Sequence, residues 1–191
     1  MRHSIIKNTG RSYWVAALTL FLSSSAAWAA TPEPLPEAQG RVILTVTGNI
    51  AVTNQSGPLG NHKADKAEFD MAMLSTLAQH EFSTETPWTE GKVHFRGVLL
   101  QDLLQRVGAK HHKVRAVALN EYYHEMDLSR PELDQLLLAT HQNGKPMKIR
   151  DKGPIWLMLP LSELKQLNKK QYHELLIWQL KLLDVRYREH L

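Results

Sequence analysis

The chain has 191 residues, of which 23 are basic, 19 are acidic and none is cysteine. Without cysteine the protein cannot be a lipoprotein or a disulfide-stabilised scaffold. Three basic residues and no acidic residue precede Ala30, which leaves 20 basic and 19 acidic residues in the rest of the chain. This balance lacks the basic footprint of nucleic-acid-binding proteins, so we expect no nucleic-acid partner.

Residues 1–29 are typical of a secretory signal peptide. A basic start is followed by the short apolar run Val15–Leu22 and by Ala27-Trp28-Ala29, which fits the small-residue pattern of a cleavage site. The apolar run is shorter than the ~20 residues of a membrane-spanning helix, and an uncleaved membrane anchor is the alternative. We expect cleavage near Ala29, a soluble protein in the bacterial periplasm, and no membrane insertion after cleavage.

The segment 30–40 contains three prolines and predicts a flexible lead-in. Residues 41–191 are then expected to form a single domain with one core. The β-branched alternation in 41–52 predicts one strand, or two strands with a turn at Gly48-Asn49. A loop is expected at 53–65.

Helical spacing of apolar residues predicts a helix over 66–80. Residues 81–84 predict a short strand that leads into a polar loop. Residues 95–109 predict a turn and an amphipathic helix closed by Gly108. Residues 114–120 predict a buried strand.

The segment 129–139 begins with Ser129, has Glu132 three residues later, and therefore predicts a helix with a capping box. Asn143-Gly144 in the next segment predicts a hairpin turn. An apolar strand is expected at 153–160, and a short helix at 161–167.

The last segment, 174–191, fits strand or helix equally well, because periodicity alone does not decide. Strands and helices therefore occur without regular alternation, which indicates the α+β class with mixed sheets and short helices.

Sequence motifs for a metal or a nucleophile are missing. Ten histidines are present, but none forms an HxxxH or HExxH pattern, and there is no cysteine to join them. No GxSxG motif and no glycine-rich phosphate loop occurs. We therefore predict neither a metal site nor catalytic residues.

Three loop segments carry the best candidates for ligand binding: 83–88, 118–123 and 150–156. Each adjoins an apolar strand, and binding residues commonly lie on loops that a rigid scaffold holds. Together they offer aromatic faces and hydrogen-bonding groups that suit a flat, polar heterocycle. The predicted ligand-binding residues are Thr84, Thr86, Trp88, Asn120, Tyr122, Tyr123, Arg150, Asp151 and Trp156.

Some of these residues have a purely structural alternative. Trp156 lies in an apolar run and fits the core, and Arg150-Asp151 fits a solvated turn. Alternation predicts that either Tyr122 or Tyr123 faces the core. Trp88 has no packing period around it and is the strongest ligand candidate.

Four segments, taken in order, resemble the molybdopterin-binding domain of the sulfite oxidase type. They are FRGVLLQDLLQRVGA, ALNEYYHEMDL, NGKPMKIRDKGPIWLMLP and WQLKLLDV, and the resemblance extends over about residues 40–187. It implies the sulfite-oxidase-type molybdopterin-binding fold.

Two departures from the enzymes of that family concern the metal and the phosphate. The enzymes use a cysteine thiolate as a molybdenum ligand, and Thr84 stands roughly where that thiol would be. A hydroxyl is not a soft anionic ligand, so it cannot replace thiolate. The enzymes also have an arginine where Trp156 stands, and the segment after Pro160 lacks their basic spacing for the cofactor phosphate.

The chain is similar to a cysteine-free periplasmic branch of this family, which binds reduced pterins without molybdenum. The resemblance implies that Trp88 and either Tyr122 or Tyr123 stack on the ring. Asp151 would accept hydrogen bonds from the ring's 2-amino and N3–H edge, and Arg150 would fix Asp151 or contact a ring oxygen. The remaining polar contacts are assigned to Thr84, Thr86 and Asn120.

The same resemblance implies a non-enzymatic sensor. Its partner would be the periplasmic domain of an inner-membrane GGDEF/EAL-type protein that makes or degrades cyclic di-GMP. Two alternatives are an oxidoreductase that uses a molybdenum cofactor, and an interaction module with an empty pocket.

Overall fold

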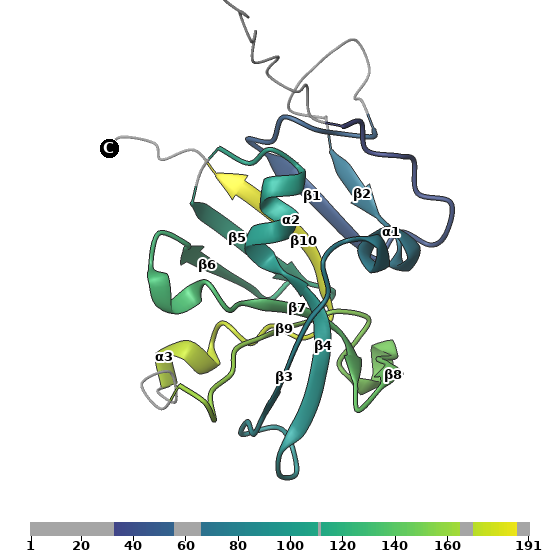
Figure 1. Cartoon of the computed structure of the whole chain (residues 1–191). Helices are drawn as coiled ribbons and strands as arrows, with labels where there is room; N and C mark the ends of the chain where they lie inside the picture. The colour runs from purple at the N-terminus through teal and green to yellow at the C-terminus, as the bar shows by residue number, and fades with distance from the viewer. Residues whose placement is uncertain (1–32, 56–65, 111, 165–169, 187–191) are drawn as a thin grey trace, which may run out of the picture. The chain divides into compact units, whose positions relative to one another are not determined.

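Two β-sheets with short helices make up the part of the chain that a computed structural model describes, namely residues 33–55, 66–110, 112–164 and 170–186 (Figure 1). The strands are β1 (Leu44–Gly48), β2 (Ala67–Phe69), β3 (His80–Thr84), β4 (Val93–Leu99), β5 (Lys113–Ala118), β6 (Tyr123–Asp127), β7 (Leu137–Gln142), β8 (Lys145–Pro146), β9 (Trp156–Met158) and β10 (Leu180–Arg186). The helices are α1 (Met71–Thr76), α2 (Leu100–Arg106) and α3 (Lys170–His173), with 3-10 turns η3 (Pro131–Leu133) and η4 (Ile149–Asp151). The predicted α+β class is confirmed.

The first sheet has the strand order β2-β1-β10-β5-β6. β10 runs parallel to β1, with Thr45 opposite Leu182, and antiparallel to β5. It belongs to the final segment, for which the sequence left strand and helix open. Pairing on both sides makes it a central strand, and α2 lies across this sheet (Figure 1).

The second sheet has the order β3-β4-β7-β8, with β9 also paired to β7. Asn143 and Gly144 connect β7 to β8 with φ values of 48° and 75°, the positive values that a two-residue hairpin turn needs. The predicted hairpin is confirmed. A Cβ on Gly97 would lie 2.0 Å from the carbonyl oxygen of Leu138, so the close approach of β4 to β7 requires glycine there.

The helix predicted over 66–80 is wrong for most of its length. Residues 67–69 form β2, because Phe69 pairs with Leu44 of β1 and is buried. Only α1 is helical, and its N-cap is Asp70, whose Oδ1 accepts a hydrogen bond from the Met73 N–H at 2.8 Å. The helical spacing was real, but the strand pairing overrides it at the start.

The helix predicted within 95–109 forms, but it is shorter than expected. Residues 93–99 are strand β4, and α2 begins only at Leu100. Gly108 follows the end of the helix with a φ of 62°, which confirms it as the residue that closes the segment.

The helix predicted over 129–139 is wrong. The Ser129 hydroxyl donates to Asp127 Oδ1 at 2.7 Å instead of capping a helix, and Glu132 pairs with Arg130. The two residues of the predicted capping box, Ser129 and Glu132, therefore make other contacts. Residues 131–133 form η3, and the apolar residues that follow belong to β7, which pairs with both β4 and β9.

Two further predictions, and one strand that was not predicted, remain to be compared with the structure. Strand 41–52 is one strand, β1, which ends at Gly48 with a φ of 90°. β6 was not predicted from the sequence. Of the short helix predicted over 161–167, only 161–164 is described, and it is a turn without helix.

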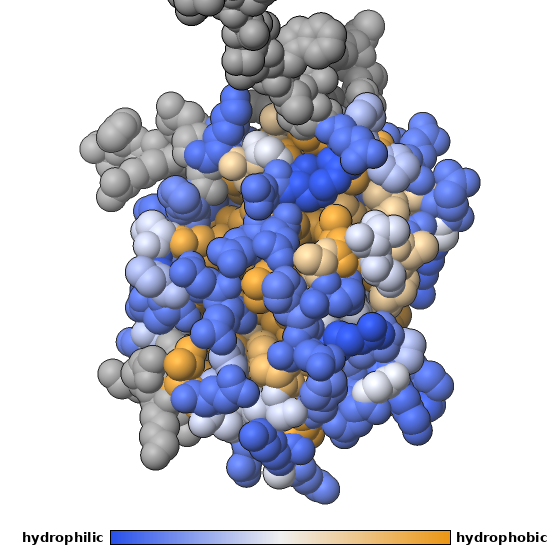
Figure 2. Space-filling view, viewed as in Figure 1, coloured by the Kyte–Doolittle hydropathy of each residue, from blue (hydrophilic) through white to orange (hydrophobic). Residues whose placement is uncertain are grey.

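Buried apolar residues form two clusters. The larger packs α2 against the first sheet, includes Leu44, Leu103 and Leu183, and extends to Leu138 and Leu157 of the second sheet. The smaller belongs to the second sheet and includes Phe95 and Trp156, with Trp178 partly buried against it. Figure 2 shows mostly hydrophilic residues on the visible face, with smaller apolar areas between them.

The segment 33–40 contacts the domain without forming a helix or strand. The Arg106 guanidinium donates to the carbonyl oxygens of Glu33 and Pro34, each at 2.9 Å. Asp70 Oδ2 accepts hydrogen bonds from the N–H groups of Gln39 at 3.0 Å and Gly40 at 2.7 Å. Asp70 therefore fixes both the end of this segment and the start of α1.

Asp70→Ala is expected to lower the free energy of unfolding by ~3 kcal/mol, because it removes an N-cap and leaves two further N–H groups without their acceptor. Hydrogen bonding from the Met73 N–H, and then from Gly40, lowers the pKa of Asp70 below its ordinary value. The stabilisation is thus fully present above the pKa of an unfolded Asp, ~3.9, and is lost as the pH falls through the lower folded-state pKa. Urea denaturation at pH 7 and at pH 3 measures both effects.

The control is Asp134→Ala, which removes an exposed carboxylate at the end of η3. It should leave stability within ~0.5 kcal/mol of wild type. Equal stability of both variants at pH 7 would contradict the role given to Asp70.

The signal peptide predicted at 1–29 lies outside the described residues. Within the described ranges, none of the helices combines the length and the apolar character needed to cross a membrane.

Candidate functional site

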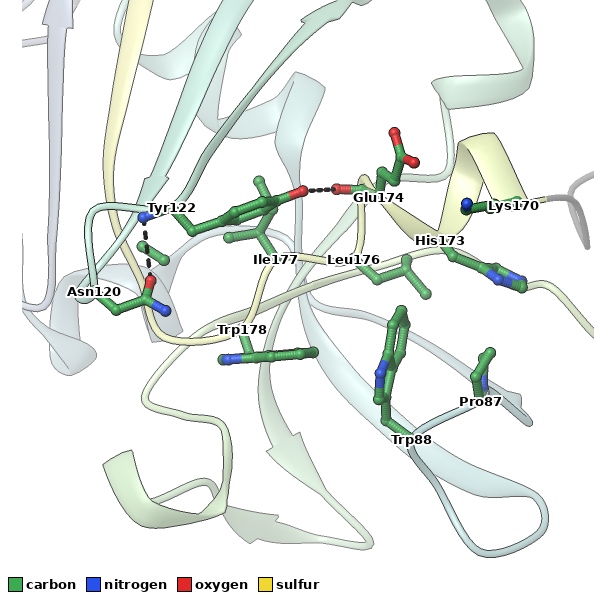
Figure 3. Close-up of a pocket in the computed structure, with 11 residues that line it drawn as sticks. Pro87, Trp88, Asn120, Tyr122, Lys170, His173, Glu174, Leu176, Ile177 and Trp178 are labelled. Carbon is green, nitrogen blue, oxygen red and sulfur yellow. Dashed lines mark hydrogen bonds between the residues drawn. The ribbon is translucent and has the colours of Figure 1, made fainter.

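A pocket of about 420 Å³ opens between three connecting segments (Figure 3). They are the β3–β4 loop (85–92), the β5–β6 turn (119–122), and the chain that runs from α3 into β10 (174–179). Most of its lining is apolar or aromatic, and a few polar groups occur at its edge. Ligand pockets for small molecules have this composition and a volume of ~300–1,000 Å³.

Three aromatic rings form the walls of the pocket: Trp88, Tyr122 and Trp178. The Trp88 and Trp178 ring centroids are 5.5 Å apart and their planes meet at 75°. Figure 3 shows Tyr122 across the pocket from Trp178, with the ring of Trp88 standing at one side. His173 contributes a fourth ring, 6.0 Å from Trp88. Edge-to-face contacts hold the rings in place and leave ring faces for a ligand.

The loop that carries Trp88 is shaped by its threonines. The Thr86 N–H donates to Thr89 Oγ1 at 2.9 Å, and the Trp88 N–H donates to Thr86 Oγ1 at 3.2 Å. Lys152 Nζ lies 3.5 Å from the Trp88 carbonyl oxygen and ties the loop to the segment after η4. These bonds fix Trp88 at the pocket although its neighbours are polar.

Asn120 supplies the polar edge of the pocket. Its Oδ1 accepts a hydrogen bond from the Tyr122 N–H at 3.2 Å, which shapes the turn in which Glu121 has a φ of 66°. The Asn120 Nδ2 and the Trp178 Nε1 have no acceptor among the residues that the structure describes. Both are therefore available to donate to a ligand.

The α3 wall is held by a cluster around Tyr172, which is buried. The Tyr172 hydroxyl donates to Glu132 Oε1 at 3.2 Å and accepts from Arg130 Nη2 at 3.1 Å. Hydrogen bonding to Glu132 raises the pKa of Arg130, so the guanidinium stays charged. This cluster anchors the helix that brings Lys170 and His173 to the pocket.

Of the nine predicted ligand-binding residues, the pocket lining contains Trp88, Asn120 and Tyr122. The other six lie elsewhere. They are Thr84, Thr86, Tyr123, Arg150, Asp151 and Trp156.

Thr84 is fully buried and takes part in a local network. Its Oγ1 accepts from the Ser162 N–H at 3.0 Å, and the Ser162 hydroxyl accepts from the Glu85 N–H at 2.8 Å. The residue that stands roughly at the thiolate position thus joins the β3 end to the 161–164 turn. Thr86 is also buried, and its hydroxyl shapes the Trp88 loop.

The two tyrosines are both exposed, so the expectation that one of them faces the core is wrong. Tyr122 lines the pocket, whereas Tyr123 lies on β6 with the Arg115 guanidinium 4.6 Å from its ring centroid. Tyr122 belongs to the turn and not to the strand, so the alternation that predicted a core position does not apply.

Arg150 and Asp151 lie in η4 as an exposed turn, with Arg150 Nε 3.7 Å from Asp151 Oδ2. Trp156 is a core residue with 1% of its surface exposed. Its Nε1 donates to the Leu176 carbonyl oxygen at 3.2 Å, and its ring centroid lies 6.5 Å from that of Trp178. Trp156 therefore supports the pocket from behind.

Sequence reasoning missed Trp178, which lines the pocket from the final segment. An aromatic residue directly after the apolar run Leu175–Ile177 was the available signal. The signal was ambiguous because strand and helix fitted equally well, and each points Trp178 to a different side. Its direction depends on Gln179, which has a φ of 53° and separates Trp178 from β10.

The donor set for a metal is poor. No group of three His, Cys, Asp or Glu side chains suited to a metal ion occurs within the described parts of the chain. The whole sequence lacks cysteine, so no thiolate is available.

Comparison with known protein families assigns residues 63–169, more than half of the chain, to the family described as the oxidoreductase molybdopterin binding domain. No curated protein gives a significant match to the chain. The two sheets with short helices agree with the sulfite-oxidase-type fold that the sequence resemblance implied, so the predicted fold is confirmed.

Proposed function

The chain belongs to the oxidoreductase molybdopterin-binding domain family, and we propose that it binds a reduced pterin without molybdenum and is not itself an enzyme. The observation that supports this best is the pocket walled by Trp88, Tyr122 and Trp178. Flat heterocycles are bound by aromatic faces together with a few polar groups that fix their orientation.

The pocket offers the two kinds of contact that a pterin ring needs. Trp178 and Tyr122 face the same space and can cover the two faces of the ring, while Trp88 closes one side (Figure 3). The Asn120 Nδ2 and the Trp178 Nε1 can donate to the ring oxygen or to a ring nitrogen. In this proposal, these residues bind and orient the ring.

The residues present do not fit a molybdenum centre. The family's molybdenum-ligand cysteine is absent, and the hydroxyl of Thr84 is already bonded to Ser162. Thiolate is the soft ligand that such a metal requires. The phosphate of a molybdopterin would also lack an arginine at position 156, because Trp156 is buried there. We therefore derive no redox step for this chain.

We further propose that the pterin-loaded protein acts in the periplasm as a sensor. Its partner would be the periplasmic domain of an inner-membrane GGDEF/EAL-type protein that makes or degrades cyclic di-GMP. The support for this part is the signal-peptide pattern of residues 1–29 and the resemblance to the cysteine-free periplasmic branch.

Calorimetric titration of the purified protein with a tetrahydropterin and with a phosphorylated molybdopterin-like ligand tests the binding proposal. We expect the unphosphorylated ring to bind at least as tightly as the phosphorylated one. Tighter binding of the phosphorylated ligand, together with molybdenum in the purified protein, would favour an oxidoreductase instead. Binding of neither ligand would favour an interaction module with an empty pocket.

Asn120→Asp tests the polar edge of the pocket. Aspartate keeps the oxygen that accepts from the Tyr122 N–H, but it replaces the Nδ2 donor by an acceptor. A mispaired buried polar group costs ~1–3 kcal/mol, so tetrahydropterin affinity should fall ~10- to 100-fold. The matched control is Asn143→Asp in the β7–β8 turn, where Oδ1 accepts from the His94 N–H in the same way. Equal affinities of the two variants would remove Asn120 from the site.

Asp151→Asn tests whether Asp151 contacts the amino edge of the ring, as the sequence predicted, or lies outside the site, as the structure places it. The Asp151 side chain is 55% exposed and does not line the pocket, so we expect tetrahydropterin affinity to stay within ~twofold of wild type. A tenfold loss would show that η4 moves over the ligand and that Asp151 accepts its hydrogen bonds.

A further inference from the structure

Two adjoining grooves, of about 320 and 510 Å³, lie beside the residues that precede β1 and beside η4. They share Arg41, Ile43, Ile149 and Pro154. Six large apolar side chains are exposed in the described part of the chain, and three of these line the grooves: Val42 at 38%, Leu119 at 41% and Ile149 at 39%. The other three, Trp88, Tyr122 and Tyr123, lie at or beside the pterin pocket.

These three side chains come from separate segments of the chain and meet on one surface. Exposed apolar residues that gather at a groove, and are rimmed by polar groups, mark sites of protein interaction more often than scattered ones do. We call the surface defined by Val42, Leu119 and Ile149, with its basic rim, the basic groove.

The rim of the basic groove is positively charged. The groove is lined by Arg41, Lys148, Arg150 and Lys181. None of the described residues that line it is acidic. Lys181 pairs with Glu121, and Arg150 lies near Asp151. Arg41 and Lys148 have no ion pair among the described residues. An acidic partner would therefore find at least two cations that are not already neutralised.

Gln179 connects the basic groove to the pterin pocket. Its Nε2 donates to the Ile149 carbonyl at 2.8 Å, and its carbonyl oxygen accepts from the Leu119 N–H at 2.9 Å. Trp178, one residue earlier, lines the pocket, and so does Asn120, one residue after Leu119. In each of these two segments, one residue therefore lines the pocket and its neighbour in the chain lines or contacts the groove.

We propose that the basic groove docks an acidic, apolar segment of a partner protein. Apolar side chains of the segment occupy the space between Val42, Leu119 and Ile149, and its carboxylates face Arg41, Lys148 and Arg150. Docking does not require a pterin. Its coupling to the pocket through Gln179 rests on the proposed function.

The probe is a fluorescein-labelled peptide, Glu-Ile-Glu-Val-Asp-Leu-Glu, titrated with the full chain after removal of bound small molecules. Fluorescence anisotropy should show saturable binding that weakens with added salt. A peptide with all acidic residues changed to Lys, and one with the apolar residues changed to Ser, should each bind at least ~tenfold more weakly, a loss of ~1.4 kcal/mol.

Ile149→Glu and Lys148→Glu each place a negative charge in the basic groove and should lower the peptide affinity at least ~tenfold. The matched control for Lys148→Glu is Lys145→Glu, which makes the same charge change on an exposed residue of β8 that does not line the groove and should have little effect. All three positions are exposed, and circular dichroism checks that the fold is retained.

Several outcomes would overturn the docking proposal. They are equal binding of the acidic and basic peptides, loss of binding in Trp88→Ala instead of the groove variants, and a dimer in solution that Ile149→Glu dissociates. The last would identify a second copy of the chain as the occupant.

A separate titration tests the coupling. Saturating tetrahydropterin should change the peptide affinity of wild type at least threefold and should have no such effect in Gln179→Ala. An unchanged affinity in wild type would overturn the coupling alone. Failure of the tetrahydropterin to bind at all would overturn the proposed function and leave the docking result, obtained without pterin, unaffected.

Discussion

Trp178→Ala is expected to lower the affinity for a tetrahydropterin ~30-fold. The indole lines the pocket. It packs edge to face against Trp88 and Trp156, with ring centroids 5.5 Å and 6.5 Å apart, respectively. Stacking adds ~0.5–1.5 kcal/mol beyond the burial of apolar area, and a total loss of ~2 kcal/mol corresponds to this factor. Isothermal titration of both proteins, well below their unfolding temperatures, measures the change.

Neighbouring aromatic residues provide the controls. Trp178→Phe keeps a ring and should lose only part of the affinity. Trp88→Ala should lose at least ~tenfold, because its ring closes one side of the pocket. Tyr122→Ala should also bind more weakly, whereas Tyr123→Ala should bind as wild type does, since Tyr123 does not line the pocket. An unchanged affinity in Trp178→Ala, or equal losses in the two tyrosine variants, would contradict the assignment of this pocket.

Trp156→Ala is expected to give the largest loss of stability, ~4 kcal/mol in the free energy of unfolding. The side chain is 1% exposed, and its ring centroid lies 5.5 Å from that of Phe95 and 6.5 Å from that of Trp178. Its removal leaves a cavity in the second sheet and takes the Nε1 donor from the Leu176 carbonyl. Urea denaturation followed by circular dichroism provides the measurement.

Trp88→Ala is the comparison for this experiment, because Trp88 is 37% exposed and lies on a loop. Its loss of stability should be at most ~1 kcal/mol. A Trp156→Ala protein that is as stable as Trp88→Ala, and has lost pterin binding instead, would mean that Trp156 contacts the ligand directly.

Local sequence signals predicted those parts of the fold that depend on local chemistry. Asn143-Gly144 determines its turn through positive φ values, and Gly108 ends α2 for the same reason. The helix expected over 129–139 failed because Ser129 and Glu132 find other partners, Asp127 and Arg130. A capping-box sequence permits a helix to begin but does not require one, and the residues that follow pair as strand β7 instead.

The candidate site was predictable only in part for a similar reason. Trp88, Asn120 and Tyr122 were recognisable, because aromatic and amide groups occur in polar loops next to apolar strands. Trp178 was not, because its contact with Trp88 joins segments far apart in the sequence. The polar loop 83–88 and the family resemblance both suggested Thr84 for the site, but its hydroxyl bonds to Ser162, a partner that no local pattern reveals.

The most direct measurement is the identification of the small molecules and metals that the protein holds after purification from its natural source. Small molecules released by mild denaturation should be identified by mass spectrometry under reducing conditions, and metals in the same sample should be quantified. We predict a reduced pterin at close to one molecule per chain, no phosphorylated pyranopterin, and no stoichiometric molybdenum. Stoichiometric molybdenum with its phosphorylated cofactor would contradict this prediction, as would a protein that carries no pterin and takes up no added tetrahydropterin.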